Sequence, residues 1–463
     1  MNQVGMDEIQ DLSSTRGNRE QYGEIFTPYS LIKRMFGMLS PITFEDPTAK
    51  WLDPGAGTGF FSIFLFWKLD AGLSNIIPDT LERRNHIISN MIYMVEIQKE
   101  NVERIRLFFG LNANISCADY LTDDTFSTMG FDYVIGNPPY NKDGIKKVPT
   151  NNHKNKKNDG TTLWFDFIKK SMRLLKDGGE LLMIVPSLWM KPDKIRAYDY
   201  LTQYKLHRIE CLNNTQTNRM FGGMAQTPTC FFRMAKQPSD GVCDIYDKDR
   251  DRYVHYTIRN QYPIPVFAVN IVNKFLRSVD EVGSIVVLKS NMPGKNVNLS
   301  ISKYGKFQYE NIKTSRLSGV SPKLDVNYSD VPLAFHGVSK LVLPHKMYGF
   351  PFLDLSGKYG ISNRDNYVIT GRSEEDLCII GEFLSTKTAL YIYEATRYRM
   401  KYLEKYAFML LPDVTKIPEL LMMRPITDTT IAKYFGFDTD DVSYIERLHT
   451  KKYDFDYIEP HPL

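Results

Sequence analysis

The tetrapeptide Asn137-Pro138-Pro139-Tyr140 directly follows an apolar stretch, residues 133–135, that has the pattern of a buried strand. Each proline fixes its φ angle and removes a backbone N–H, so this loop offers carbonyl oxygens without competing donors. The Asn137 side-chain oxygen and the Pro138 carbonyl could both accept hydrogen bonds from one planar NH₂ group and turn its nitrogen lone pair toward a methyl donor. Tyr140 could stack on a flat substrate. The alternative is a proline-stiffened turn.

A glycine loop lies upstream, between an expected strand at residues 50–52 and an expected helix at residues 60–69. Its G-x-G-x-G spacing differs from the dinucleotide G-x-G-x-x-G fingerprint, and no Walker Gly-Lys-Ser/Thr follows. The carboxylate of Asp53 can meet a cationic group. S-adenosylmethionine carries an amino group and a sulfonium, so it fits better than a pyrophosphate. A plain tight turn is the alternative. The expected cofactor-binding residues of this loop are Asp53, Pro54, Gly55, Gly57 and Gly59.

Two further acids follow the next two expected strands. Glu96 could accept hydrogen bonds from both hydroxyls of a ribose, as carboxylates do in other doubly wound nucleotide sites. Asp119 could accept one from an adenine amino group, and Tyr120 could stack on that adenine. An inserted helix around residues 78–89 would explain the long separation between Glu96 and the glycine loop. Each acid on its own could equally be a solvated loop carboxylate or a helix cap.

The first half of the chain alternates short apolar strands with helices, which predicts an α/β fold with a mostly parallel, doubly wound sheet in residues 1–236. Residues 237–463 have a looser pattern that predicts a separate α+β domain. The expected strands of the first domain are residues 50–52, 92–95, 114–117, 133–135, 180–185 and 230–234. The expected helices are residues 60–69, 97–109 and 162–175, the last ended by a glycine stop at residues 178–179.

The composition is that of a globular protein. The 463 residues predict two or three domains at about 100–200 residues each. Hydrophobic residues at 43% and charged residues at 24% exclude a mainly disordered chain. The net charge of +4 does not by itself indicate nucleic acid, so any basic binding surface must be local.

The five cysteines are scattered, with no C-x-x-C pair, which predicts a reducing compartment, no disulfide framework and no structural metal. Residues 1–20 are polar and lack the apolar core of a signal peptide. No apolar run of about 20 residues could span a membrane. We therefore expect a soluble, cytoplasmic protein.

Together, the glycine loop and Asn137–Tyr140 resemble the S-adenosylmethionine-dependent amino-methyltransferases. Their order resembles the γ class of DNA adenine-N6 methyltransferases from restriction–modification systems, in which a cofactor-contacting segment comes first. That segment is present as residues 23–28. Thr27 is a good N-cap and Pro28 a good first helical residue, so a helix at residues 29–39 would follow and could hold the methionine carboxylate at its N-terminus. The alternative is a simple capped helix.

The resemblance covers residues 22–234 and has several implications. It implies a Rossmann-like methyltransferase domain in residues 1–236 and a DNA target-recognition domain in residues 237–463. It implies transfer to an adenine that has been flipped out of duplex DNA, with Asn137, Pro138, Pro139 and Tyr140 as the catalytic residues. Phe221 would sandwich the base opposite Tyr140, although a core phenylalanine is nearly as good an interpretation.

The loop after the tetrapeptide, residues 141–160, carries six lysines against two aspartates. Such a loop beside the reacting base suits contacts with phosphates, and a solvated surface loop is the alternative. No nuclease-like cluster of acids and a lysine is evident, so a separate restriction endonuclease is the expected partner. The phosphate-contacting candidates are Lys142, Lys146, Lys147, Lys154, Lys156 and Lys157.

Other substrates remain open. The same tetrapeptide also serves methylation of cytosine N4, RNA adenine and protein glutamine in families that this site resembles. Glutamine methyltransferases of that kind are usually shorter and would not need the long second half. An alternative from a different functional class is a nucleic-acid-binding module whose methyltransferase fold is inactive. The intact residues Asp53, Gly57, Asn137 and Tyr140 argue against it.

Overall fold

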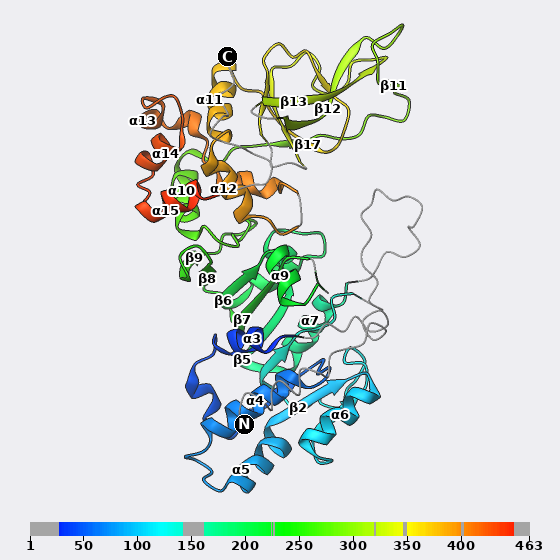
Figure 1. The fold of residues 1–463 in the computed structure, drawn as a ribbon, viewed down its shortest axis with the longest axis vertical. Helices are drawn as coiled ribbons and strands as arrows, with labels where there is room; N and C mark the ends of the chain where they lie inside the picture. The colour runs from blue at the N-terminus through cyan, green and yellow to red at the C-terminus, as the bar shows by residue number, and fades with distance from the viewer. Residues whose placement is uncertain are drawn as a thin grey trace. The chain divides into compact units, whose positions relative to one another are not determined.

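The computed structural model describes residues 27–141, 162–223, 225, 227–318, 321–345, 350–399 and 402–448. The chain divides into two compact units, Met1–Asp244 and Ile245–Leu463 (Figure 1). The predicted boundary at residue 236 falls inside strand β7 (Thr229–Pro238), which continues the sheet of the first unit, so the division comes later than we expected. It falls instead within the next strand, β8 (Val242–Asp247).

The first unit is built on a mostly parallel sheet, so the predicted fold class is confirmed. The strand order is β3-β2-β1-β4-β5-β7-β6-β8-β9, of which β9 and the end of β8 already belong to the second unit. Strands β3, β2, β1, β4 and β5 pair in parallel, whereas β7 runs antiparallel to both β5 and β6. The remaining bounds are β1 (Trp51–Asp53), β2 (Ile92–Glu96), β3 (Asn114–Cys117), β4 (Phe131–Gly136), β5 (Leu175–Pro186), β6 (Tyr204–Leu212) and β9 (Arg252–Thr257).

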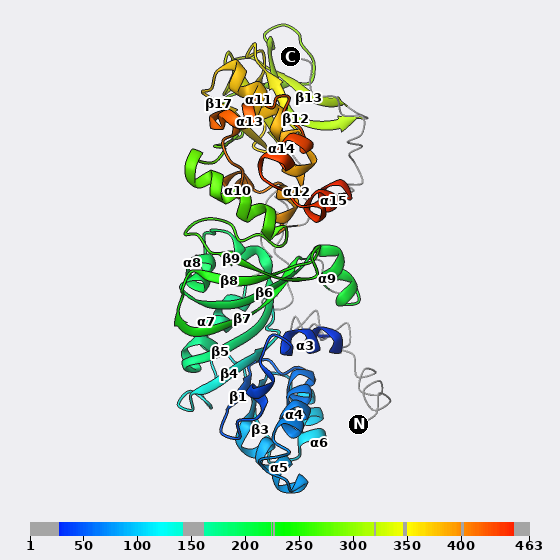
Figure 2. The ribbon, with the colours of Figure 1, turned by 90° about the vertical axis from the view of Figure 1, so that its left-hand side faces the viewer.

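Helices cover both faces of this sheet: α3, α4 and α6 lie on one side, and α7 and α8 on the other (Figure 2). This arrangement is the doubly wound one that the alternating sequence pattern predicts. The helices of the first unit are α3 (Tyr29–Phe36), α4 (Phe60–Gly72), α5 (Thr80–His86), α6 (Lys99–Phe109), α7 (Trp164–Leu174), α8 (Ala197–Thr202) and α9 (Asn214–Met220). Short 3-10 or π turns occupy Pro41–Phe44, Ile87–Met91 and Ser187–Met190.

The predicted glycine stop after α7 is wrong, because β5 begins at Leu175 and already contains both glycines. The pairing of β4 with β5 shifts register between Phe131 and Tyr133. At Gly179 a Cβ would lie 2.9 Å from the Phe131 carbonyl oxygen, so the two backbones approach each other too closely for a side chain. These glycines therefore serve an irregularity within a strand.

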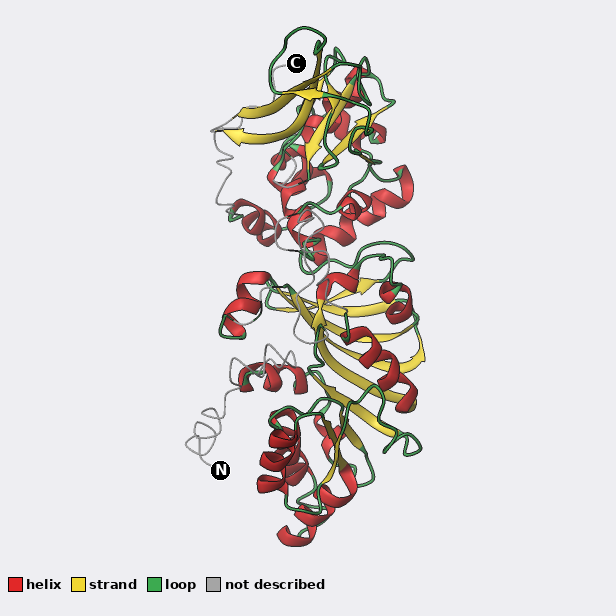
Figure 3. Ribbon diagram, turned by 90° about the vertical axis from the view of Figure 1, so that its right-hand side faces the viewer, coloured by secondary structure: helices red, strands yellow, loops and turns green. Residues whose placement is uncertain are grey.

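The second unit is α+β, as predicted. It contains two four-stranded sheets, ordered β10-β17-β14-β15 and β11-β13-β12-β16, together with several helices (Figure 3). The strands are β10 (Leu288–Lys289), β11 (Leu299–Ser300), β12 (Tyr309–Ser318), β13 (Ser321–Ser329), β14 (Lys340–Pro344), β15 (Phe352–Asp354), β16 (Gly360–Ile361) and β17 (Asn366–Thr370). The helices are α10 (Val269–Val282), α11 (Glu374–Leu384), α12 (Lys387–Ala395), α13 (Pro418–Leu421), α14 (Asp428–Tyr434) and α15 (Thr439–Glu446), with 3-10 turns at Lys405–Leu410 and Val414–Lys416.

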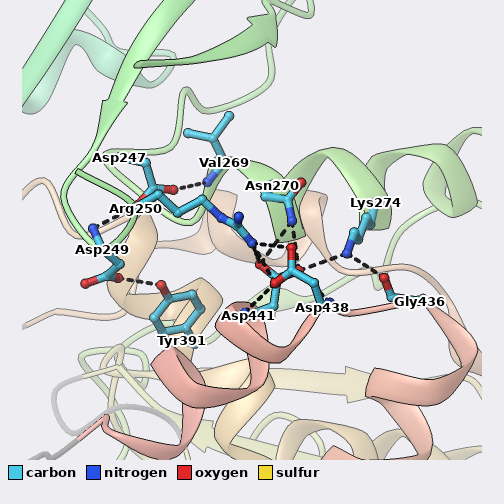
Figure 4. A network of polar contacts seen from close by, with 10 residues as sticks. All are labelled: Asp247, Asp249, Arg250, Val269, Asn270, Lys274, Tyr391, Gly436, Asp438 and Asp441. Carbon is cyan, nitrogen blue, oxygen red and sulfur yellow. Dashed lines mark hydrogen bonds and ion pairs between the residues drawn. The ribbon is translucent and has the colours of Figure 1, made fainter. Parts of the chain in front are cut away.

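A buried polar network ties α15 to the rest of the second unit (Figure 4). The Asp441 carboxylate at its centre accepts hydrogen bonds from Arg250, Asn270 and Lys274. Asp438, the N-cap of α15, accepts a further hydrogen bond from Arg250 at 2.7 Å. None of the helices in the described ranges is long and apolar enough to cross a membrane.

Candidate active site

The two motifs that were expected to act together lie side by side, because they follow neighbouring parallel strands. The pairs Trp51–Tyr133 and Leu52–Val134 align β1 with β4, so Asp53 and Gly136 end the two strands at the same edge of the sheet. A Cβ at Gly136 would lie 3.3 Å from the Asp53 Oδ1 atom. Gly136 therefore allows the strand that leads to Asn137 to pass close to the Asp53 carboxylate, a function that the sequence did not indicate.

Asn137 is held by a residue from the far N-terminal motif. Its Nδ2 atom donates a hydrogen bond to the Thr27 hydroxyl oxygen at 3.0 Å, and Thr27 is only 6% exposed. The prediction that Thr27 caps the following helix is wrong: Pro28 is the N-cap of α3, and that helix ends at Phe36 rather than at residue 39. The hydroxyl is thus available to orient the amide, whose Nδ2 atom lies on the Thr27 side.

Tyr140 closes the tetrapeptide. Its carbonyl oxygen accepts a hydrogen bond from the Leu163 N–H at 3.1 Å, and the neighbouring Asn141 forms an antiparallel bridge with Thr162. The Tyr140 hydroxyl is buried and has no hydrogen-bond partner among the described residues, and burial raises the pKa of this phenol far above its ordinary value. The phenol therefore stays neutral, which suits a ring that stacks.

The glycine loop turns sharply from β1 into α4. Gly57 and Gly59 have φ angles of +53° and +88°, in the left-handed region, and Gly59 is the N-cap of α4. A Cβ at Gly59 would also lie 3.0 Å from the Ile105 side chain. Conformation and space therefore both require glycine at this position.

Asp53 is a buried carboxylate with one oxygen left open. It is 2% exposed, and its Oδ2 atom accepts a hydrogen bond from the Ser62 hydroxyl at 3.1 Å, a partner that the sequence did not reveal. Its Oδ1 atom has no hydrogen-bond partner in the described part of the chain. Burial raises the pKa of Asp53 to about 7, the Ser62 hydroxyl and the Gly55 backbone offset this only in part, and Glu96 adds to the rise. Such a carboxylate favours a bound cation, so the site fits the amino group of S-adenosylmethionine.

Glu96 ties the glycine loop to the end of β2. Its Oε2 atom accepts from the Gly57 N–H at 2.7 Å, and its Oε1 atom accepts from the Gln98 N–H at 2.8 Å. Each carboxylate oxygen can accept more than one hydrogen bond, so these contacts leave room for hydroxyl donors. The ribose contact stays a prediction. The structure adds that Glu96 also sets the conformation of the loop.

Asp119 and Tyr120 follow β3, as expected, but they have different environments. Asp119 is exposed and accepts a hydrogen bond from the Leu121 N–H at 2.9 Å. Tyr120 is buried, its hydroxyl lies 3.0 Å from the Ser171 hydroxyl, and its ring centroid lies 5.0 Å from that of Phe167. The structure gives Tyr120 a packing role against α7, and its contact with adenine stays a prediction.

The remaining candidates are less well placed. Phe221, at the C-cap of α9, is 1% exposed, which agrees with the alternative of a core phenylalanine, and its stacking on the base stays a prediction. Beyond Asn141, the basic loop lies outside the described residues, and with it all six phosphate-contacting candidates, Lys142, Lys146, Lys147, Lys154, Lys156 and Lys157.

A doubly wound sheet with a glycine loop after β1 and Asn-Pro-Pro-Tyr after β4 defines the class as that of the Rossmann-like methyltransferases. Within this class, residues 78–221 match the family model described as Eco57I restriction-modification methylase. The resemblance to methyltransferases of restriction–modification type is thereby confirmed.

Individual relatives are distant. A Mycoplasma pneumoniae protein described as an uncharacterized adenine-specific methylase is 24% identical over 243 residues, which cover 36% of this chain and 56% of the relative. The type II methyltransferase M.BsuBI of Bacillus subtilis is 25% identical over 220 residues, covering 44% of this chain and 39% of its own length. The chain thus spans about half or less of each of these relatives. The M protein of the type I restriction enzyme EcoKI is 19% identical, with a TM-score of 0.37 over 49% of this chain and 48% of that one.

Proposed function

We propose that the chain is a site-specific DNA methyltransferase that modifies the N6 amino group of an adenine flipped out of duplex DNA. The observation that carries this proposal is that Gly136, next to Asn137 in the chain, lies close to the open oxygen of Asp53, at the carboxyl ends of two adjacent parallel strands. This edge of an α/β sheet is where ligands bind. The name of one relative, which specifies adenine, supports the choice of base.

The cofactor in this proposal is S-adenosylmethionine, which supplies an electrophilic methyl group. Asp53 holds its amino group, Glu96 accepts from the ribose, and Gly55, Gly57 and Gly59 let the backbone approach closely. Pro54 starts the turn, and Asp119 and Tyr120 border the adenine of the cofactor. Thr27 and Pro28 belong to this region because they lead into the N-terminus of α3.

On the substrate side, Asn137 Oδ1 and the Pro138 carbonyl accept the two hydrogens of the target amino group. Pro139 stiffens the loop, and Tyr140 stacks on the base. Positioning and hydrogen-bond electrostatics then carry the catalysis, and the proton leaves after the new bond has formed, so no strong base is needed. The second unit would act as the target-recognition domain, and a separate restriction endonuclease would be the partner.

The test is methyl transfer from labelled S-adenosylmethionine to duplex DNA of varied sequence, with RNA and protein as parallel substrates and nucleoside analysis of the product. N6-methyladenine in DNA supports the proposal. N4-methylcytosine, or transfer only to RNA or protein, keeps the site chemistry and overturns the substrate. An absence of transfer to every substrate, from protein shown to be folded, would favour an inactive binding module.

A further inference from the structure

One segment of the second unit combines positive charge with exposed apolar side chains. Residues 286–308, called here the lysine segment, contain four lysines and no aspartate or glutamate. The segment includes two short edge strands, because β10 begins the order of one sheet and β11 begins the order of the other. It therefore runs from the edge of one small sheet to the edge of the other.

The lysines of this segment are largely without counter-charges. Lys289, Lys295 and Lys303 are exposed, and none of them forms an ion pair with any residue in the described ranges. Only Lys306 is paired, with Asp330 at 3.3 Å. Three uncompensated positive charges on one stretch of backbone favour a polyanionic partner.

The apolar side chains distinguish this segment from an ordinary solvated surface. Ile301 is 92% exposed and Tyr304 is 61% exposed. The Tyr304 ring is held 5.2 Å from that of Phe307, within a tight antiparallel bridge of these two residues. The segment also exposes Val286, Leu288, Met292 and Leu299. Exposed apolar groups that lie this close together in the chain, next to lysines, suit a segment that binds a partner.

A competing explanation is that the lysines only protect the edge strands from pairing with other chains, which is a common role of lysine at such edges. That role is best served by charge without exposed apolar groups nearby. Ile301 and Tyr304 would instead invite association at the same edge. Lysine and exposed apolar groups together suit a partner that offers both phosphates and flat or apolar surface.

We propose that the lysine segment binds the phosphate backbone of duplex DNA through Lys289, Lys295 and Lys303, with Ile301 and Tyr304 packing against sugars or bases. This inference rests on the proposed function, for which it names the surface that grips the substrate. Phosphate contacts of this kind position a protein on the duplex without reading sequence. Their number sets the dependence of binding on salt.

The test compares the full chain with the triple variant K289Q/K295Q/K303Q, using fluorescence anisotropy of a labelled duplex over a series of salt concentrations. Three lost phosphate contacts lower the slope of log K against log salt by about 2 to 3 and weaken binding at low salt by at least about tenfold. S-adenosylmethionine binding stays unchanged.

The matched control removes the same charge elsewhere, from Lys68 of α4, Arg106 of α6 and Lys433 of α14, which are exposed and outside the site. The variant K68Q/R106Q/K433Q should keep the wild-type slope. An equal slope and affinity in both triple variants would overturn the proposal. A variant I301S/Y304S should weaken binding without changing the slope, which separates apolar packing from charge.

The outcomes also separate this inference from the proposed function. Wild-type protein that methylates DNA, with a K289Q/K295Q/K303Q variant that binds it normally, would keep the function and reject the surface. Wild-type protein that binds DNA without methylating any substrate would reject the function, and the salt slope would still decide the surface. Wild-type protein that binds no duplex DNA would reject both.

Discussion

Two buried aspartates, Asp53 in the first unit and Asp441 in the second, have opposite electrostatic environments. Asp53 accepts one side-chain hydrogen bond and keeps an oxygen without a partner in the described chain, and burial raises its pKa to about 7. Burial also acts to raise the pKa of Asp441, but hydrogen bonds from Asn270, Lys274 and Arg250 outweigh it, so that pKa lies below the ordinary value. The Asp441 carboxylate is satisfied by partners within the fold, whereas Asp53, at the start of the turn Asp53–Gly59, keeps one oxygen without a partner among the described residues.

The largest predicted effect is on the methyl transfer itself, at the candidate active site that contains Asp53. Asn137→Ala removes the Oδ1 acceptor and should reduce methyl transfer by about 10²- to 10³-fold, the usual cost of a lost transition-state hydrogen bond. Binding of S-adenosylmethionine, measured by calorimetry, should survive. Near-normal turnover of this variant would show that Asn137 does not hold the target amino group.

The second effect concerns stability. Asp441→Asn removes the negative charge that pairs with two cations, Arg250 and Lys274. Both cations then remain in a poorly solvated region without that counter-charge. The free energy of unfolding of the second unit should fall by about 3 kcal/mol, as measured by urea denaturation. Asp53→Asn in the first unit should leave the cofactor-free protein as stable as before, or more stable, at pH 8.

The two variants differ in stability for a physical reason. Asp53→Asn removes a negative charge that burial disfavours, whereas Asp441→Asn removes a negative charge that three hydrogen-bond donors stabilise. Calorimetry with S-adenosylmethionine provides the matched readout. Asp53→Asn should weaken cofactor binding, and Asp441→Asn should not. Equal losses of stability in the two variants would contradict the comparison.

The third effect is on pH dependence. Below pH 7 the Asp53 carboxyl of the cofactor-free protein is protonated and cannot pair with an ammonium group. Binding of S-adenosylmethionine should therefore release a proton and weaken by up to about tenfold for each pH unit below 7. The range from about pH 5.5 to 7.5 is suitable because α-amino groups stay largely protonated there. Glu96 is the carboxylate that acts on Asp53, so Asp53→Asn should flatten the profile and Glu96→Gln should shift its midpoint downward.

Ionisation of the two aspartates changes the stability of the protein with pH in opposite directions. Because the folded pKa of Asp53 is raised from 3.8, ionisation of this carboxyl costs stability as the pH rises from about 4 to about 7. Because the folded pKa of Asp441 is lowered, its contribution is present above about pH 4 and is lost as the pH falls further. The free energy of unfolding of each unit, measured as a function of pH, tests the two directions separately. The variants D53N and D441N, which lack the respective carboxyl, serve as references.

The sequence predicted the parts of the site that are local in the chain. Asn137–Tyr140 and the glycine loop each follow a short apolar strand, and parallel strands bring their carboxyl ends together. It could not predict contacts between distant residues, such as that of Thr27 with Asn137, or that of Ser62 with Asp53 across a sharp turn. It also misread glycines 178–179, because a glycine at a helix end and a glycine in a strand irregularity look alike until the neighbouring backbone is known.

The smallest predicted effect tests the contact that links the N-terminal motif to the catalytic loop. Thr27→Val keeps the shape of the side chain and removes the hydroxyl that accepts from Asn137 Nδ2. Loss of one such hydrogen bond costs about 1 kcal/mol, so kcat should fall by about fivefold to tenfold. Cofactor affinity should change little, because the hydroxyl acts through the orientation of the amide.

Thr27→Ser provides the matched control, since it restores the hydroxyl and should restore kcat. If Thr27 instead contacts the cofactor directly, as its motif suggests, Thr27→Val would raise the dissociation constant of S-adenosylmethionine and leave kcat at saturation nearly unchanged. Comparing the change in kcat with the change in cofactor affinity therefore decides whether Thr27 orients Asn137 or, like Asp53, binds the cofactor. The same measurement shows whether the N-terminal segment orients only the Asn137 amide or also takes part in cofactor binding next to Asp53.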